Sequence, residues 1–209
     1  MLKAVPKADF GSTGGEWAVI GLARSGAKVE DSYYKSYYAN VEKYVSERKG
    51  VLHETNYTEY SRLVLALSAI GKDPRNVAGY NILRPLGDYE KVVGEGLSGP
   101  VLALIALDCG SYEIPTSPSF KRQATRQMYV NRILQGQLPE GGWSLSGTGE
   151  KVPFEADTTG MVLQALAPYR NWAEVKGAIE KALARISKEQ KAGGGFEFAG
   201  VSSSGSTVQ

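Results

Sequence analysis

Four stretches of small and apolar residues recur along the chain, and each is long enough for a helix rather than a strand. They are Glu16–Gly26, Ser61–Gly71, Gly99–Gly110 and Gly160–Tyr169. Each stretch is rich in Ala, Leu or Val and is apolar on nearly all sides, whereas a buried strand is shorter and richer in β-branched residues. The pattern therefore predicts four buried helices.

The first three apolar stretches each end in a glycine, and these glycines recur at similar intervals. Gly26, Gly71 and Gly110 lie 45 and 39 residues apart. A glycine directly after a helix readily adopts the left-handed conformation that closes the helix end. Self-similarity with a period of roughly 40 to 50 residues is typical of helix-pair repeats.

Amphipathic segments separate the apolar stretches. Asp31–Arg48 places tyrosines and valines near one face and charges opposite them, and Phe120–Leu134 and Trp172–Lys188 behave similarly. A smaller helix is predicted over Pro74–Tyr80, with Asp73 as its N-cap. Buried helices that alternate with amphipathic ones predict an all-α array of inner and outer helices. Such an array closes into a barrel or extends as a straight solenoid, and periodicity does not choose between them.

Composition bounds the class of protein without naming it. The chain has 209 residues, enough for one domain with a sizeable core, and 25 glycines, about 12% against a usual 7%. The net charge of +2 and the scattered basic residues argue against a nucleic-acid-binding surface. No apolar run reaches 18 residues, so we expect no membrane span.

A sharper motif occurs twice in the C-terminal half. Gln137–Trp143 and Gln190–Phe196 both read as glutamine, three residues, glycine, any residue and an aromatic residue, and their glutamines lie 53 positions apart. Glutamine offers a donor and an acceptor to unsatisfied groups at a helix end, and glycine lets a turn approach closely. We expect the polar stretches that follow, Glu155–Thr159 and Ser202–Thr207, to begin the next buried helices.

This motif resembles the glutamine–tryptophan repeat of squalene and oxidosqualene cyclases, which prenyltransferase β-subunits share in a looser form. The resemblance implies that the glutamine caps a helix end and that the aromatic ring stacks beside it, which ties adjacent repeats together. The expected structural residues of the motif are Gln137, Gly141, Trp143, Gln190, Gly194 and Phe196.

The segment from Tyr57 to Pro115 resembles more narrowly the prenyltransferase-like repeat domains of bacterial cell-surface proteins. The resemblance implies an α/α toroid of helical-hairpin repeats over residues 1–209, in one domain. Ser206–Gln209 stands where Thr158–Met161 stands in the previous repeat, so we expect a partial toroid and a longer natural chain. An extracellular or cell-surface location follows from the resemblance alone, and a cytoplasmic one stays open.

The catalytic signatures of the resembled enzymes do not occur in the chain. Cyclases of this kind use an Asp-x-Asp-Asp cluster, for which the nearest string is Glu155-x-Asp157. We expect Asp157 to be a helix N-cap, with a ligand contact as the lesser alternative. Protein prenyltransferases hold zinc with Asp, Cys and His, but here Asp108 and Cys109 are adjacent and His53 is the single histidine. We expect no metal site and a buried Cys109.

Aromatic residues near the starts of the predicted inner helices are the remaining binding candidates. In a toroid these helix ends open on one side, where a ring stacks a sugar or flanks an apolar ligand. Packing between repeats is the competing interpretation. With the two acidic residues, the candidate ligand-binding set is Trp17, Tyr60, Trp143, Phe154, Glu155 and Asp157.

The sequence favours a non-catalytic ligand-binding or scaffolding module of a larger bacterial surface or secreted protein, with no cofactor. Its expected partner is a small molecule, cobalamin-like, glycan or isoprenoid, or the neighbouring domains of the same protein. The alternative is a terpenoid cyclase or prenyltransferase-like enzyme acting on an isoprenoid. A third hypothesis is an interaction platform whose groove binds a peptide.

Overall fold

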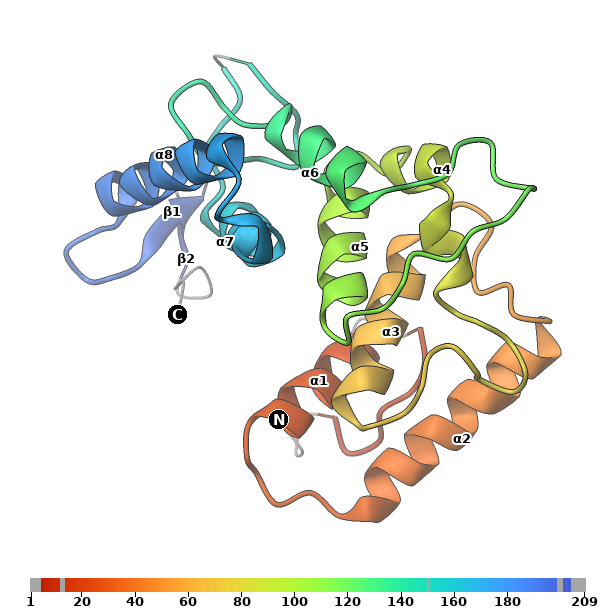
Figure 1. Cartoon of the computed structure of the whole chain (residues 1–209). Helices are drawn as coiled ribbons and strands as arrows, with labels where there is room; N and C mark the ends of the chain where they lie inside the picture. The colour runs from red at the N-terminus through yellow and green to blue at the C-terminus, as the bar shows by residue number, and fades with distance from the viewer. Residues whose placement is uncertain (1–4, 12–13, 150, 199–200, 204–209) are drawn as a thin grey trace. The chain divides into compact units, whose positions relative to one another are not determined.

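The computed structural model describes residues 5–11, 14–149, 151–198 and 201–203, which form helices joined by irregular segments (Figure 1). The elements are α1 (Gly15–Arg24), α2 (Asp31–Glu47), α3 (Thr58–Ala69), the 3-10 helix η1 (Arg84–Gly87), α4 (Tyr89–Val93), α5 (Ser98–Asp108), α6 (Arg126–Leu134), α7 (Ala156–Leu166), the 3-10 helix η2 (Ala167–Tyr169), α8 (Ala173–Glu189), β1 (Phe196–Phe198) and β2 (Val201–Ser203).

The helical prediction is confirmed, since the one sheet in the described chain is a ribbon of two three-residue strands. The chain divides into two compact units: residues 1–95 with 105–125, and residues 96–104 with 126–209. Helix α5 contributes to both units. The closed or open toroid, and a single repeat domain over residues 1–209, stay predictions.

The first unit is built on the buried faces of α1, α2 and α3. Helices α1 and α3 pack against each other, as Figure 1 shows, and each buries apolar side chains. Helix α2 contributes Tyr37, Val41 and Val45, which are fully buried at four-residue spacing. This spacing puts the three side chains on one stripe of the helix, so the sequence prediction of an amphipathic α2 is confirmed.

The glycine signal for helix ends is confirmed after α1 and α3 and is wrong after α5. Gly26 and Gly71 have positive φ angles of 68° and 71°. After α5 the left-handed residue is Ser111, with φ 51°, one position beyond Gly110. Gly110 is needed for a different reason, because a Cβ atom there would lie 2.5 Å from the Tyr112 ring.

The helix predicted over Pro74–Tyr80 is absent, and a tight hairpin occupies this segment. Val77 and Tyr80 pair as an isolated bridge, and the two residues between them, Ala78 and Gly79, have φ angles of 50° and 88°. Two successive left-handed residues are incompatible with a helix and typical of a two-residue hairpin turn. Asp73 does not cap a helix but accepts bonds from the backbone and side chain of Arg75.

The helix predicted over Phe120–Leu134 is shorter than expected and begins at Arg126. Residues 120–125 are irregular because their backbone bonds to a distant segment. The Tyr89 N–H donates to the Arg122 carbonyl at 2.9 Å, and the Ala124 N–H donates to the Gly87 carbonyl at 2.8 Å. Backbone groups engaged in this way cannot also form helical hydrogen bonds.

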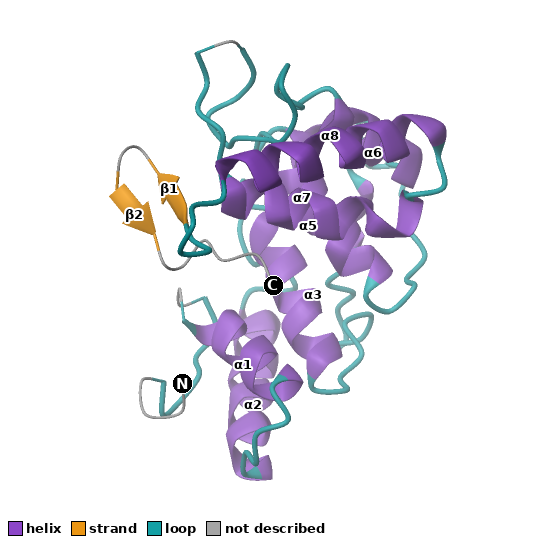
Figure 2. Cartoon of the chain, turned by 90° about the vertical axis from the view of Figure 1, so that its left-hand side faces the viewer, coloured by secondary structure: helices purple, strands orange, loops and turns teal. Residues whose placement is uncertain are grey.

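In the second unit α8 packs against α7 and α6, as Figures 1 and 2 show. The turn after α6 and the turn after α8 have the same backbone hydrogen bonds. The Leu138 N–H donates to the Gly142 carbonyl at 2.9 Å, and the Lys191 N–H donates to the Gly195 carbonyl at the same distance. The two glutamine-glycine-aromatic segments therefore form the same turn, each directly after a helix.

The glutamine and the aromatic ring of the first motif have roles different from those expected. The Gln137 amide donates to the Ala178 carbonyl at 2.7 Å, which lies inside α8 rather than at a helix end. The indole N–H of Trp143 donates to the Ile133 carbonyl at 2.8 Å, near the last residue of α6. The ring thus caps the helix end and the glutamine ties the turn to α8.

The glycines of the first motif are required by close contact. A Cβ atom on Gly141 would lie 2.5 Å from the Lys181 carbonyl oxygen of α8, and one on Gly142 would lie 2.6 Å from the Phe154 ring. Both residues also have positive φ angles, 93° and 78°. The turn can therefore rest on the backbone of α8 only with glycine at these positions.

The second motif leads into a strand. Of the helix start predicted in Ser202–Thr207, Ser202 and Ser203 lie in β2, and the other residues lie outside the described chain. Phe196 is buried and opens β1, which pairs antiparallel with β2. Gln190 bonds locally, from its amide to the Gly194 carbonyl at 2.9 Å, instead of reaching a neighbouring helix. The predicted helix start at Ser206–Gln209 lies outside the described residues.

Replacing Gly141 with alanine should destabilise the protein by about 1–3 kcal/mol or more, because the new Cβ meets a backbone oxygen and the φ angle is positive. The matched control is Gly177→Ala. Gly177 lies exposed inside α8 with open space around it, so alanine should stabilise the helix by up to about 1 kcal/mol. Urea unfolding followed by circular dichroism measures both, and equal effects would contradict the turn geometry.

Trp143→Ala should cost about 3–5 kcal/mol, since a fully buried ring is removed. Trp143→Phe should cost less, because the ring volume is largely kept and mainly the hydrogen bond to Ile133 is lost. Trp17→Ala is the control, because Trp17 is 44% exposed. A Trp143→Ala effect as small as that of Trp17→Ala would count against the capping role of the indole.

Candidate functional site

The six predicted ligand-binding residues are divided between the two units. Trp17 and Tyr60 belong to the first unit, and the other four belong to the second. Trp17 lies exposed in the first turn of α1 and lines none of the pockets described below. Neither unit taken by itself therefore brings all six residues together at one opening.

Tyr60 has a structural role as well as a place in a pocket. Its hydroxyl accepts a hydrogen bond from the Leu52 N–H at 2.9 Å and donates to the His53 carbonyl at 3.2 Å. The side chain is 3% exposed, so a ligand meets little of it. Tyr60 fixes the loop that follows α2 rather than presenting a free face.

Among the aromatic residues of the second unit, Trp143 is inaccessible and Phe154 is half-buried. Phe154 lines a small pocket of about 370 Å³ beside the Gln137–Trp143 turn. The Arg185 guanidinium lies over its ring, 5.5 Å from the centroid. Arg185 also pairs with Glu140, so this pocket is occupied at one side by an ion pair.

Glu155 is the N-cap residue of α7, and its carboxylate is fully engaged. It accepts hydrogen bonds from the Ser144 hydroxyl at 2.8 Å, the Leu145 N–H at 3.0 Å and the Thr158 hydroxyl at 2.6 Å. Burial alone would raise the pKa of Glu155, but these bonds outweigh it and hold the pKa below its ordinary value. An ionised carboxylate cannot supply the proton that a cyclase acid must deliver.

The prediction that Asp157 is an N-cap is wrong, because α7 begins at Ala156 and Glu155 occupies that position. Asp157 lies one residue inside the helix, in its first turn, and is exposed. A carboxylate there favours the helix dipole without closing the helix end.

The largest pocket described in the first unit was not predicted from the sequence. It has a volume of about 660 Å³, within the range of roughly 300–1,000 Å³ typical of small-molecule sites. We refer to it as the Asp88 pocket. Its lining residues are Lys49, Gly50, Val51, His53, Glu54, Tyr57, Tyr60, Gly79, Tyr80, Asn81, Arg84, Pro85, Asp88, Lys91, Ser119 and Phe120.

The lining of the Asp88 pocket is graded from buried to exposed. Asp88, Tyr57 and Tyr60 are buried and form its inner part. Tyr80 and Phe120 are half-buried and present ring surface. The exposed lining residues, which make up the rim, are mostly polar or charged: Lys49, Val51, His53, Glu54, Gly79, Asn81, Arg84, Lys91 and Ser119.

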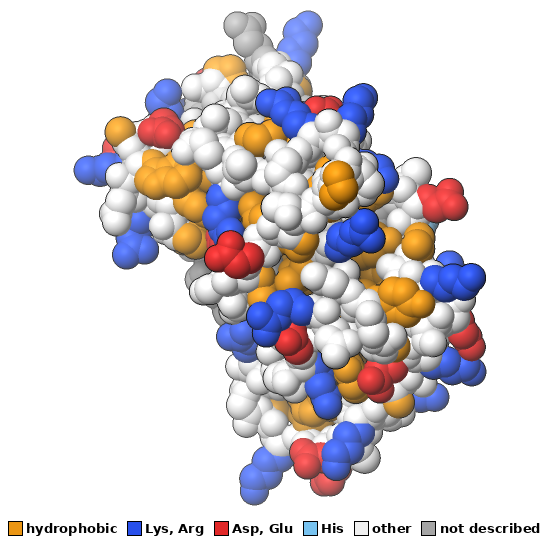
Figure 3. Space-filling model, turned by 45° about the vertical axis from the view of Figure 1, so that its right-hand side comes forward, with side chains coloured by type: hydrophobic (Ala, Val, Ile, Leu, Met, Phe, Trp, Pro, Cys, Tyr) orange, Lys and Arg blue, Asp and Glu red, His pale blue; other side chains and the backbone are white. Residues whose placement is uncertain are grey.

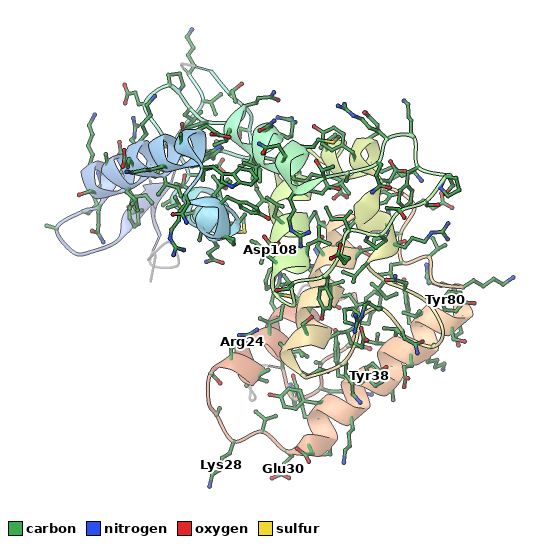
Figure 4. All side chains as sticks on the ribbon, viewed as in Figure 1. Arg24, Lys28, Glu30, Tyr38, Tyr80 and Asp108 are labelled. Carbon is green, nitrogen blue, oxygen red and sulfur yellow. The ribbon has the colours of Figure 1, made fainter. Side chains whose placement is uncertain are left out.

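The two half-buried rings are held by contacts with glycines. The Tyr80 ring lies against Gly50, where a Cβ atom would come within 2.6 Å of it, and Figure 4 shows Tyr80 near the C-terminal end of α2. Phe120 lies against Gly87, where a Cβ atom would meet the ring at 2.6 Å and the Pro115 carbonyl oxygen at 2.2 Å. Any larger residue at either position would displace a ring from the pocket.

A long-range cap positions the inner tyrosines. The Glu95 carboxylate accepts hydrogen bonds from the backbone N–H groups of Tyr57 and Thr58, at the start of α3. Burial raises the pKa of Glu95 more than these bonds lower it. Because Glu95 follows α4, this cap joins the segment around Asp88 to the first turn of α3.

Asp88 has an unsatisfied carboxylate oxygen. The residue is 3% exposed, and its Oδ1 atom has no hydrogen-bond partner in the part of the chain that is described. The nearest cation, the Lys91 ammonium, lies 3.9 Å from Oδ2, beyond hydrogen-bond distance. Buried polar atoms in native proteins are nearly always hydrogen bonded, and Asp88 lines the pocket with one carboxylate oxygen unsatisfied in the described chain.

Two further rim residues have defined states. The Nδ1 atom of His53 accepts hydrogen bonds from the backbone N–H groups of Thr55 and Asn56, so the neutral ring carries its proton on Nε2 and is a donor there. A hydrogen bond to Tyr57 raises the pKa of Lys91, which is therefore charged at neutral pH. Both side chains add donors to the pocket.

Sequence reasoning missed this site because its parts come from irregular segments. Gly87-Asp88 carries no periodic signal, and Tyr80 was placed in a helix that does not form. The one available sign was the presence of Pro85 and Gly87, because a proline and a glycine close together mark a constrained loop. Loops held by a rigid scaffold are common places for binding residues.

The described residues contain no group of three or more His, Cys, Asp and Glu side chains placed to hold a metal ion. The prediction of a buried Cys109 is wrong, since it is exposed just after α5, and its thiol donates to the Ala106 carbonyl at 3.2 Å. Asp108, labelled in Figure 4, is the last residue of that helix.

The surface carries charges of both signs. Figure 3 shows Lys and Arg side chains interspersed with Asp, Glu and apolar side chains on the visible face. None of the helices in the described chain is long and apolar enough to cross a bilayer.

No protein-family model matches the chain, and no curated protein or solved structure matches it significantly. The resemblance to prenyltransferase-like repeats therefore stays a prediction that depends on the residues quoted above.

Glu155→Gln should destabilise the protein at neutral pH by about 1–3 kcal/mol, because three hydrogen bonds lose their charged acceptor. The folded pKa of Glu155 lies below its ordinary value of 4.5, so the stabilisation is present above that pH and is lost as the pH falls through the lowered pKa. The stability difference between the two proteins should therefore shrink on acidification.

Thermal unfolding of both proteins from pH 7 to pH 3 measures this difference. Glu180→Gln, on an exposed position of α8, controls for the loss of one negative charge. A gap between wild type and Glu155→Gln that stays constant down to pH 3 would show that the ionised carboxylate is not the stabilising form.

Proposed function

We propose that this chain is a non-catalytic ligand-binding or scaffolding module of a larger bacterial surface or secreted protein, built on prenyltransferase-like α/α-toroid repeats. Its partner is a small molecule that enters the Asp88 pocket. The observation that carries the binding function is the pocket of about 660 Å³ lined by Asp88, a buried residue with one carboxylate oxygen that has no partner among the described residues.

The repeat architecture is supported by the two turns that follow α6 and α8. They share their hydrogen-bond pattern 53 positions apart, and each directly follows a helix. The turn after α8 follows a helical hairpin in which α7 and α8 pack together, and the turn after α6 is its counterpart one repeat earlier. A toroid is the closed arrangement of such hairpins in the resembled proteins, and it is part of this proposal.

A binding role is favoured over isoprenoid chemistry by the state of the acidic residues. Glu155 is ionised and hydrogen bonded, and Asp157 is exposed in a helical turn. A cyclase acid needs a proton held at neutral pH, generally by burial or a like charge. Asp88 is buried and lies beside the Lys91 ammonium, which is 3.9 Å from its Oδ2 atom, rather than beside a second carboxylate.

Thermal unfolding of the chain against cobalamins, isoprenoid diphosphates and oligosaccharides tests the proposal. A specific binder should raise the midpoint by several degrees, which corresponds to roughly 1–2 kcal/mol of binding linkage. Mass spectrometry of the recovered ligand should then show it unchanged, because the module is not catalytic.

Two results would contradict this proposal. Turnover of an isoprenoid diphosphate would favour the enzyme. The absence of any shift across all three ligand classes would remove the small-molecule function.

Tyr60→Phe is a useful companion variant, because it loosens the loop after α2 through loss of the bonds to Leu52 and His53. It should reduce the shift produced by a pocket ligand.

A further inference from the structure

The Asp88 pocket combines one unsatisfied acceptor with a rim of donors. Asp88 Oδ1 lacks a partner, whereas Arg84, Lys91 and the Nε2 atom of His53 bring N–H groups to the lining. A ligand that completes this pattern must donate at the buried end and accept at the rim. Hydroxyl groups do both, since each is one donor and two acceptors.

The charges of the lining disfavour strongly ionic ligands. Lys49, Arg84 and Lys91 outnumber Glu54 and Asp88, so a cationic ligand meets net repulsion. An anionic ligand finds the rim cations but meets a like charge at Asp88. A neutral ligand with several hydroxyl groups avoids both penalties and still satisfies the buried carboxylate.

The apolar part of the lining is aromatic rather than aliphatic. Val51 and Pro85 are the aliphatic side chains among the lining residues, which is little for an isoprenoid tail. Tyr80 and Phe120 are half-buried, and their rings are held in place by contacts with glycines. Fixed aromatic faces beside a few convergent polar groups suit a flat ring that has an apolar face and a hydroxylated edge.

We propose that the Asp88 pocket binds a carbohydrate. The Asp88 carboxylate accepts a hydrogen bond from a sugar hydroxyl, and Tyr80 and Phe120 contact the apolar face of the same sugar. Arg84, Lys91 and His53 donate to the hydroxyl oxygens at the rim. This inference rests on the proposed ligand-binding function and names the class of ligand.

Isothermal titration of the whole chain with cellobiose, maltose and chitobiose tests the inference, with geranyl diphosphate and cyanocobalamin as comparison probes. At least one disaccharide should bind. Asp88→Asn should weaken its binding about tenfold or more, because a charge-assisted hydrogen bond is lost. Asp157→Asn, which removes an exposed carboxylate from the second unit, should leave the affinity unchanged.

A stability measurement separates a binding residue from a structural one. Asp88→Asn should unfold at the same temperature as wild type or higher, because it removes a buried charge whose Oδ1 lacks a partner. Tyr80→Leu should also weaken binding, and Tyr38→Leu is its control. Figure 4 shows Tyr38 on α2 and Tyr80 near the end of that helix, and Tyr38 is not among the lining residues of the pocket.

The outcomes separate the two proposals. Binding of geranyl diphosphate or cyanocobalamin but of no disaccharide overturns the carbohydrate inference and leaves the ligand-binding function in place. A disaccharide that binds wild type and Asp88→Asn equally overturns the role of Asp88. Weaker binding to Asp157→Asn with normal binding to Asp88→Asn assigns the site to the second unit. No binding of any probe overturns both proposals.

Discussion

Short helices leave unsatisfied backbone groups at each end, and the fold depends on long-range partners that satisfy them. The Glu95 carboxylate binds the first N–H groups of α3, and the Trp143 indole binds a carbonyl at the end of α6. The Gln123 amide reaches the carbonyl oxygens of Gly87, at the end of η1, and of Pro115, in the irregular segment after α5. Because each partner comes from outside the element that it bonds, satisfying a backbone group also fixes where another segment packs.

The Asp88 pocket follows from this way of closing helices. The chain between α3 and α5 contains η1 and α4 but no long outer helix, and residues 120–125 pair with this segment. Irregular backbone, not a helix, therefore surrounds Asp88. Gly87 is fixed by the Pro115 carbonyl and the Phe120 ring, so the residue after it is held with little freedom.

The sequence predicted the helices whose apolar residues follow a helical period, since burial decides them locally. It predicted α2 and α8 to within a residue or two, and the turn after α6 through its glycine spacing. It was wrong at Pro74–Tyr80 and at residues 120–125, where pairing between distant segments overrides a helical pattern. The candidate site was missed for the same reason, because its residues gather only once those segments pair.

Two buried carboxylates show how burial alone fails to mark a site. Glu155 is 8% exposed and Asp88 is 3% exposed, so their loss of hydration is similar. Glu155 recovers that loss through three donors, whereas Asp88 Oδ1 recovers nothing from the described chain. Removing the Glu155 charge should therefore lower the stability of the protein, whereas removing the Asp88 charge should keep or raise it. A buried carboxylate that lowers the stability of the free protein has a physical reason to be there when a ligand supplies the missing donor. For this reason we assign the site to Asp88.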